Sequence, residues 1–304
     1  YRRNSSVPPT KEEERAPEKA DLEERPEFTV FVQTKQQFEM VLGKFKMYRK
    51  LSERSYGIYL AAESFDAQEW KKLADRCHEV GVRCYLMMPR IFRKEAEQYF
   101  RKQMELLTSA GFDALGIGSM EEPGFLREAG IELPMYFDQG MYSWNHLAGA
   151  AMERYGADRL TIPVELNERE IRDSGVQGEM IVYGYLPMMI SAQCIRKTTL
   201  GCSGKSEIMW LKDRKDMRFP VVNQCRFCYN TIYNSAPLSL LGLSEQVTGL
   251  KPNAVRLNFT VEEPAAAGEI LDAFFEEYGM SEKAAEPPVL RNQFTRGHFK
   301  RGVE

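Results

Sequence analysis

The alternation of strand-like and helix-like segments limits the fold of this chain more than any other feature. Short runs of β-branched and aromatic residues predict strands, and most of them precede a segment with apolar residues at helical spacing. Gly81, Gly111 and Gly156 each close a predicted helix shortly before the next strand. Units of this kind are typical of parallel sheets, because the helix carries the chain back to the edge where the next strand begins.

The rhythm predicts eight strands and seven helices. The strands are expected at 28–32, 56–61, 82–88, 114–117, 134–137, 160–163, 179–183 and 254–259, and the helices at 36–51, 66–80, 94–110, 123–129, 143–155, 167–173 and 264–278. We therefore expect an α/β chain that folds as a closed (β/α)8 barrel of the TIM type. An open, doubly wound sheet is the alternative, but no GxGxxG follows the first strand.

The pattern also predicts the domain organisation. The barrel is expected over 27–279, with a cysteine-rich insertion after the seventh strand at about 185–253, and a C-terminal extension over 280–304. Residues 1–26 are expected to be a disordered linker or tag, since eleven of the sixteen residues from Lys11 to Pro26 are charged. The chain begins at Tyr1 without a methionine, so we expect an upstream domain of a longer chain.

Four of the six cysteines lie close together in the sequence. Cys194, Cys202, Cys225 and Cys228 are separated by seven, twenty-two and two residues. Four thiols in one polar insertion predict a metal site, because thiolates are soft ligands that suit zinc or an iron–sulfur cluster. Only the last pair forms the CxxC of a zinc knuckle, and the spacing alone leaves both metals open.

The bulk composition favours a cytoplasmic protein. The net charge is −3. The sequence contains no run of eighteen apolar residues, so it predicts no membrane span. No apolar core of a secretory signal follows the first residues. Six cysteines are too few for a disulfide scaffold, so we expect reduced thiols.

Candidate catalytic residues lie where predicted strands end, which is where a barrel gathers its chemistry. Asp138 directly follows the strand at 134–137, and Glu165 follows the strand at 160–163. Two carboxylates at neighbouring strand ends can divide acid and base work if burial separates their pKa values. Capping of the next helix is the alternative role for the Glu165 segment. The chain has no HExxH, GxSxG or P-loop, which disfavours a conventional protease.

The cysteine segment is locally basic. Residues 194–230 contain eight Lys or Arg and three acids, with aromatic residues between them. This composition suits single-stranded nucleic acid, although a solvated loop or charge balance beside anionic thiolates is an alternative. The candidate RNA-binding residues are Arg196, Lys197, Arg214 and Arg226, with Arg296 in the C-terminal segment.

The segment from Glu179 to Cys194 resembles the signature of the collagenase-like peptidases, family thirty-two among the peptidases of unknown catalytic type. That signature reads Glu-x-Phe-x-x-Gly, then a small residue, Leu and Cys, then four residues and Gly-x-Cys. Matching residues are Glu179, Gly184, Leu186 and Cys194, whereas Ile181, Pro187 and Ala192 replace its Phe, first Cys and second Gly. The segments 138–145, 163–167 and 295–299 resemble further motifs of the same family.

The resemblance implies a barrel fold and a function that the residues alone do not reveal. Relatives hydroxylate RNA bases or a quinone precursor without oxygen, and they carry a [4Fe–4S] cluster on four cysteines. The RNA-modifying relatives depend on prephenate. By this resemblance the four clustered cysteines would hold the cluster, with Cys202 in place of the cysteine lost at Pro187. The pocket would be lined by Asp138, Tyr142, Asn145 and Glu165.

The leading hypothesis is therefore an iron–sulfur barrel enzyme that modifies RNA, either ribosomal or transfer RNA, with a small organic co-substrate such as prephenate. One alternative is a collagenase-like protease, metal-dependent or of unknown type. The other is a binding module without enzymatic activity, stapled by zinc.

Overall fold

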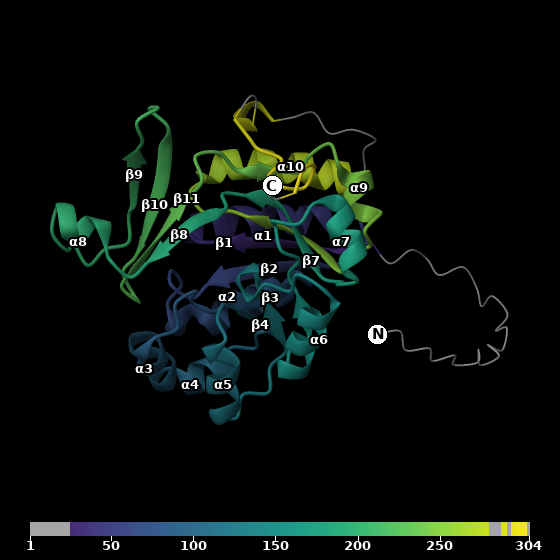
Figure 1. Ribbon diagram of the computed structural model, residues 1–304. Coiled ribbons are helices and arrows are strands. Elements are labelled where there is room, and N and C mark those ends of the chain that lie inside the picture. Colours follow the sequence, from purple (N-terminus) through teal and green to yellow (C-terminus); the bar gives the residue numbers. More distant parts are fainter. Residues whose placement is uncertain (1–24, 280–286, 291–292, 303–304) are drawn as a thin grey trace, which may run out of the picture.

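Eight parallel strands form a curled sheet in the computed structural model, which describes residues 25–279, 287–290 and 293–302 (Figure 1). The sheet order is β12-β7-β13-β1-β2-β3-β4-β5-β6, and β12 is the antiparallel member at one edge. The strands are β1 (Glu27–Val32), β2 (Tyr56–Ala61), β3 (Arg83–Met87), β4 (Ala114–Ile117), β5 (Met135–Phe137), β6 (Arg159–Leu160), β7 (Glu179–Gly184), β12 (Leu238–Ser239) and β13 (Ala254–Asn258).

Helices follow most of the parallel strands, as the periodicity predicts. They are α1 (Lys35–Tyr48), α2 (Ala67–Glu79), α3 (Lys94–Lys102), α4 (Met104–Ser109), α5 (Glu121–Glu128), α6 (His146–Tyr155), α7 (Glu168–Ser174), α9 (Ser244–Thr248) and α10 (Pro264–Gly279). The predicted helix over 94–110 is in fact two helices, because the backbone leaves the helical conformation at Gln103. Thr34 begins α1 with a capping box that also uses Gln37.

The two edges of the parallel sheet meet at one place. Thr161, just after β6, forms a parallel bridge with Glu179 at the start of β7, and the Ile162 amide donates to the Glu179 carbonyl at 2.9 Å. The predicted α/β class and parallel strands are thus confirmed, in a sheet that curls until β6 approaches β7.

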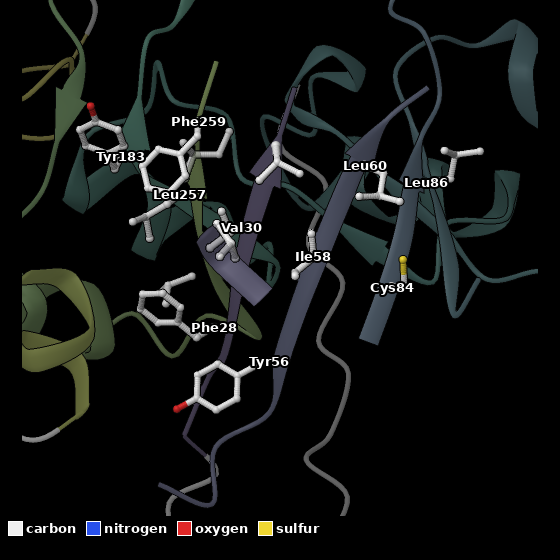
Figure 2. Packing of buried hydrophobic residues seen from close by; sticks show 14 of the residues in the cluster. Phe28, Val30, Tyr56, Ile58, Leu60, Cys84, Leu86, Tyr183, Leu257 and Phe259 are labelled. Atoms are coloured by element: carbon white, nitrogen blue, oxygen red, sulfur yellow. The ribbon is translucent and has the colours of Figure 1, made fainter. Parts of the chain in front are cut away.

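The outer face of the sheet carries the main apolar core. Successive side chains of a strand point to opposite faces, so Phe28 and Val30 of β1 lie on the same side as Ile58 and Leu60 of β2 (Figure 2). All four side chains are fully buried. Helix α1 packs against α10 and against β1 and β2 on this side, so the outer face is the layer that joins sheet and helices.

The inner face carries buried charges instead. Arg256 of β13 lies with one guanidinium nitrogen 3.0 Å from the Glu179 carboxylate and another against the carboxylate of Asp138. The hydroxyl of Thr29 donates to Glu179 at 2.6 Å and that of Tyr59 at 3.1 Å. All five side chains are buried. Hydrogen bonds therefore satisfy the carboxylate of Glu179, as a charge buried among strands requires.

A second charged group lies where the strands begin. The Glu27 carboxylate is 2.8 Å from the Arg159 guanidinium and 3.1 Å from that of Arg83, and it accepts a hydrogen bond from Tyr85 at 2.7 Å. The guanidinium of Arg159 also lies over the ring of Tyr136, 4.2 Å from its centroid. The interior of the curled sheet is therefore filled with paired charges and aromatic rings.

Residues 187–233 form a second, antiparallel sheet between β7 and β12, within the predicted break of the βα rhythm. Its order is β8-β11-β10-β9, and it projects from the parallel sheet (Figure 1). Its elements are β8 (Pro187–Ser191), α8 (Ile195–Thr199), β9 (Ile208–Lys212), β10 (Arg218–Gln224) and β11 (Tyr229–Tyr233). One face of this sheet covers the carboxyl ends of the parallel strands, since Gln224, Tyr229 and Tyr233 line a cavity there together with Arg256.

The turn between β10 and β11 anchors the second sheet to the first. The Arg226 guanidinium donates to the carbonyl oxygen of Ala62, just after β2, at 2.7 Å. The next side chain, Phe227, is buried and stacks on Phe100 of α3 at 6.0 Å, with its edge contact to Tyr99 at 5.4 Å. The two sheets are thus held together by residues that lie between Cys225 and Cys228 in the sequence.

The C-terminal segment packs against β12. Thr295 forms a bridge with Leu238, and Arg296 donates to the carbonyl oxygens of Ser239 at 2.8 Å and Leu241 at 2.6 Å. The predicted disordered segment 1–26 lies almost entirely outside the described residues. Residues 280–286 of the predicted C-terminal extension also lie outside them. In the described residues, no helix is both long enough and apolar enough to cross a membrane.

Replacement of Arg256 by methionine is expected to lower the free energy of unfolding by about 3–5 kcal/mol, because it leaves two buried carboxylates without their shared cation. Glu179→Gln should lower the free energy of unfolding by less, since Arg256 keeps its ion pair with Asp138. Urea denaturation measures the free energy of unfolding of both variants. The control is Lys71→Met, which breaks the exposed pair with Asp75 and should cost about 0–1 kcal/mol. An Arg256→Met loss no larger than that of the control would contradict a central role for the buried pair.

Phe227→Ala is expected to lower the free energy of unfolding by about 3–5 kcal/mol, the usual cost of removing a buried ring. Because the ring packs the antiparallel sheet against α3, hydrogen exchange in β10 and β11 should also speed up more than in β1 and β2. Phe219→Ala provides the control, since it removes a half-buried ring from β10. Equal losses for the two variants would show that Phe227 is not the anchor.

Candidate functional site

A small cavity lies where the antiparallel sheet covers the ends of the parallel strands. We call it the mouth cavity. Its volume is about 40 Å³, and its polar lining includes Gln33, Glu63, Arg90, Asp138 and Asn258, all at or just after the ends of parallel strands. Active sites of parallel barrels are built at this end of the strands, so the mouth cavity is the first candidate site.

Two larger cavities adjoin the mouth cavity. The first, of about 550 Å³, shares Gln33, Glu63, Gln224 and Thr260 with it and reaches Cys225, and we call it the cysteine-side cavity. The second, of about 250 Å³, shares Arg90 and Pro187 with it and is lined by Tyr142 and Glu165, and we call it the tyrosine-side cavity. The three cavities together connect the cysteine segment to the charged residues of the mouth.

Asp138 lies between two arginines in the mouth cavity. Burial alone would raise the pKa of its carboxyl, but the charges of Arg256 and Arg90 outweigh burial and lower the pKa. The Arg90 guanidinium is 2.9 Å from the carboxylate. Asp138 is therefore held as an anion and positions the arginines, which is a different role from proton exchange near neutral pH.

Of the two carboxyl groups that line the mouth cavity, Glu63 is the one whose pKa is raised. Burial raises the pKa of Glu63, although a hydrogen bond from the Tyr229 hydroxyl opposes the change. Burial also raises the pKa of Tyr233 to about 12, and the amide of Gln33 donates to its hydroxyl at 3.1 Å. Glu63 lines both the mouth cavity and the cysteine-side cavity, so it is better placed for proton transfer than Asp138.

Several polar atoms beside the mouth lack a hydrogen-bond partner among the described residues. They are the side-chain oxygens of Gln224, Asn258 and Thr260. Buried polar atoms are normally satisfied, so such a group is expected to bind water or a polar ligand. The arrangement therefore suits a ligand that carries hydrogen-bonding groups.

The four clustered cysteines are free and lie at the ends of the antiparallel sheet. Cys194 caps α8, with its sulfur 3.5 Å from the Lys197 amide nitrogen, and Cys225 and Cys228 flank the turn between β10 and β11. Burial raises the pKa of Cys225, and the neighbouring thiols of Cys194, Cys202 and Cys228 raise it further. The fold thus brings the thiols of Cys194, Cys202 and Cys228 into electrostatic range of Cys225.

The donor chemistry of this quartet fits a thiolate-bound metal centre. Cys228 adopts a left-handed backbone conformation with φ of 55°, which forms the tight turn of the CxxC pair. Within the described residues, however, no group of three or more His, Cys, Asp or Glu side chains is arranged as a ready site for a metal ion. Cys77 and Cys84, in contrast, are fully buried and are part of the main apolar core.

The four predicted catalytic residues are only partly brought together. Asp138 lies in the mouth cavity, and Tyr142 and Glu165 line the tyrosine-side cavity. Asn145 instead begins α6, where its side chain accepts a hydrogen bond from the Ala148 amide at 3.0 Å. Tyr142 has φ of 54° and is exposed, a strained conformation of the kind that functional sites tolerate.

The five predicted RNA-binding residues have different surroundings. Arg226 and Arg296 donate to backbone carbonyls, so their guanidinium groups are part of the fold. Arg196 is paired with Glu207. Lys197 and Arg214 are exposed and remain candidates for a nucleic-acid contact.

Arg256 and Tyr229 are site residues that the sequence analysis missed. Arg256 is the one charged residue in an otherwise apolar strand pattern, and that interruption signals a side chain directed into a polar interior. Tyr229 follows a cysteine in the antiparallel sheet, and no local pattern shows that it would meet Glu63. None of the three histidines lines these three cavities.

Three comparisons with known proteins, of folds, of curated sequences and of family models, give different results. Solved structures with similar folds include a provisionally assigned fructose-1,6-biphosphate aldolase from Coccidioides immitis, at 10% identity over 84% of this chain and 80% of that chain, with a TM-score of 0.46. Thiamine phosphate pyrophosphorylase from Pyrococcus furiosus gives 11% identity over 85% and 100%, with a TM-score of 0.43. At these TM-scores the likeness carries no information about activity.

A search of the curated proteins gives no match. The model of peptidase family U32, in contrast, matches residues 49–265. This match spans most of the chain, including β2 to β13 and the four clustered cysteines. It is consistent with the resemblance that the Glu179–Cys194 segment carries, and the chain belongs to peptidase family U32.

Proposed function

We propose that this protein is an iron–sulfur enzyme of the family that hydroxylates RNA. The observation that carries the proposal is a set of four free thiols in the antiparallel segment, of which Cys225 lines a cavity that adjoins the mouth of the parallel sheet. Cys225 lines the cysteine-side cavity, and the other three thiols act on its pKa. A redox centre placed there would lie next to the polar residues of the mouth.

The proposal includes a full (β/α)8 barrel with the cysteine sheet inserted after its seventh parallel strand. The bridge between Thr161 and Glu179 supports closure, because it joins the two edges of the parallel sheet. Cys194, Cys202, Cys225 and Cys228 would hold a [4Fe–4S] cluster, whose ligands need only surround a larger object than a single ion. The cluster would supply electron transfer. The six free cysteines support a reducing, cytoplasmic setting.

The residues of the mouth would bind and orient the reactants. Arg90 is anchored by Asp138 through one nitrogen and lines both the mouth and tyrosine-side cavities, so its remaining donors are available to a carboxylate. A small organic co-substrate such as prephenate would be bound there. Glu63, with its raised pKa, would hold or accept a proton, and the Tyr229 hydroxyl would keep its carboxyl oriented.

Protein purified under strict exclusion of oxygen is expected to be brown, with about four iron atoms per chain. Changing any one of Cys194, Cys202, Cys225 or Cys228 to serine should remove most of the iron and the visible absorption, because serine is a poor ligand for this centre. Elemental analysis and absorption spectroscopy measure the outcome.

Cys77→Ala is the matched control, since it removes a buried thiol of α2 that belongs to the main core and not to the antiparallel sheet. It should keep the iron. A colourless wild-type protein with one tightly bound zinc would overturn the iron–sulfur proposal in favour of a zinc-stapled module. Chelator-sensitive cleavage of gelatin, without any change to RNA, would favour a protease.

Arg90→Gln is expected to weaken binding of prephenate about tenfold or more, because a charge-assisted hydrogen bond contributes about 1.5–3 kcal/mol. Isothermal titration of the iron-loaded protein measures the dissociation constant, and iron content should be unchanged. Lys35→Gln, at the cysteine-side cavity, is the control for the loss of one positive charge. Equal weakening by both variants would mean that charge alone, not Arg90, attracts the ligand.

A further inference from the structure

The antiparallel sheet continues beyond the cavities as an exposed arm. Strands β9 and β10 project away from the parallel sheet with their connecting turn at the far end (Figure 1). Val222 of β10 is paired with Ile208 of β9, and both line the cysteine-side cavity. One face of the arm is therefore continuous with the wall of that cavity.

Strand alternation identifies the other side chains of this face. Paired residues of antiparallel strands lie on the same face, and the face repeats every second residue. The pairs Trp210 with Pro220 and Lys212 with Arg218 thus follow Ile208 and Val222 along the arm, away from the cavity. We call the residues Ile208, Trp210, Lys212 and Arg218 the arm strip.

The arm strip combines one exposed aromatic ring with two cations. Trp210 is 57% exposed, which is unusual for a residue of its size. Lys212 is paired with Asp216 at 2.8 Å, and both side chains are largely exposed, so the pair is weak and easily exchanged. Arg218 is exposed and makes no ion pair within the described part of the chain.

We propose that the arm strip binds single-stranded RNA and leads it toward the cysteine-side cavity, with one base stacked on Trp210 and the flanking phosphates on Lys212 and Arg218. Stacking platforms beside a basic track are how proteins bind single strands without reading their sequence. The positive charge of the strip selects a polyanion over an apolar peptide. The inference rests on the proposed function, and it assigns RNA contact to residues other than Arg226 and Arg296.

The test uses the full chain, a fluorescein-labelled oligouridylate of about a dozen nucleotides, and fluorescence anisotropy at several salt concentrations. Trp210→Ala should weaken binding about tenfold or more. Lys212→Gln and Arg218→Gln should each reduce the slope of log binding constant against log salt concentration by about one, because each removes one phosphate contact. Leu211→Ala, on the opposite face of β9, and Arg169→Gln, on the exposed side of α7, are the matched controls and should leave binding unchanged.

Intrinsic fluorescence provides a second, direct measurement. In a Trp144→Phe background the remaining indoles are Trp210 and Trp70, and Trp70 is fully buried. Unlabelled oligouridylate should therefore quench the exposed emission, and Trp210→Ala should abolish the quenching.

The outcomes separate this inference from the proposed function. If the wild type binds the oligonucleotide and Trp210→Ala binds equally well, the arm strip is overturned while RNA remains the substrate class. If the wild type does not bind RNA at all, both fail. If Trp210→Ala instead dissolves a dimer seen by analytical ultracentrifugation and leaves RNA binding unchanged, the strip is an interface between two copies of the chain, and the inference is overturned.

Discussion

The ion pairs of Arg256 join parts of the sheet that are far apart in the strand order. Arg256 extends from β13 to Glu179, at the start of β7, and to Asp138, directly after β5. Four strands separate β13 from β5 in the sheet order, so the interaction crosses the interior of the curled sheet. Asp138 in turn fixes Arg90. The curvature of the sheet and the orientation of the cationic group at its mouth therefore depend on the same buried guanidinium.

Burial of these charges has a cost that the fold must offset. Removing ions from water is expensive, and a buried pair is seldom more stable than apolar residues of the same volume. Here the interior also holds the hydroxyls of Thr29 and Tyr59, which complete the hydrogen bonding of Glu179. The apolar outer face, around Phe28 and Val30, supplies the hydrophobic stabilisation. The two faces of the sheet thus differ, with apolar packing on the outer face and hydrogen-bonded charges on the inner one.

The strands were predictable because the side chains that each strand directs to the outer face of the curled sheet are apolar and recur at every second residue. Asp138 was also accessible to sequence reasoning, since it directly follows an apolar strand. Residues that depend on contacts between distant segments were not. Arg226 counted as a basic residue in a basic segment, yet it donates to the carbonyl of Ala62, which no local pattern reveals. Asn145 is different, because it caps α6 through the Ala148 amide only three residues away, and such a cap is a local pattern that the sequence could have shown.

The antiparallel sheet has a consequence for access to the mouth. A space of about 40 Å³ accommodates only a few water molecules, whereas any organic molecule with a ring is several times larger. A molecule of that size would fit within the mouth cavity itself only after the cover formed by Gln224, Tyr229 and Tyr233 has moved outward, although Glu63 and Arg90 also line the two larger cavities. Since Phe227 packs the turn between β10 and β11 against α3, an outward movement of the cover would be a rotation about that turn. The speed of such a rotation, rather than bond chemistry, would then set an upper limit on turnover.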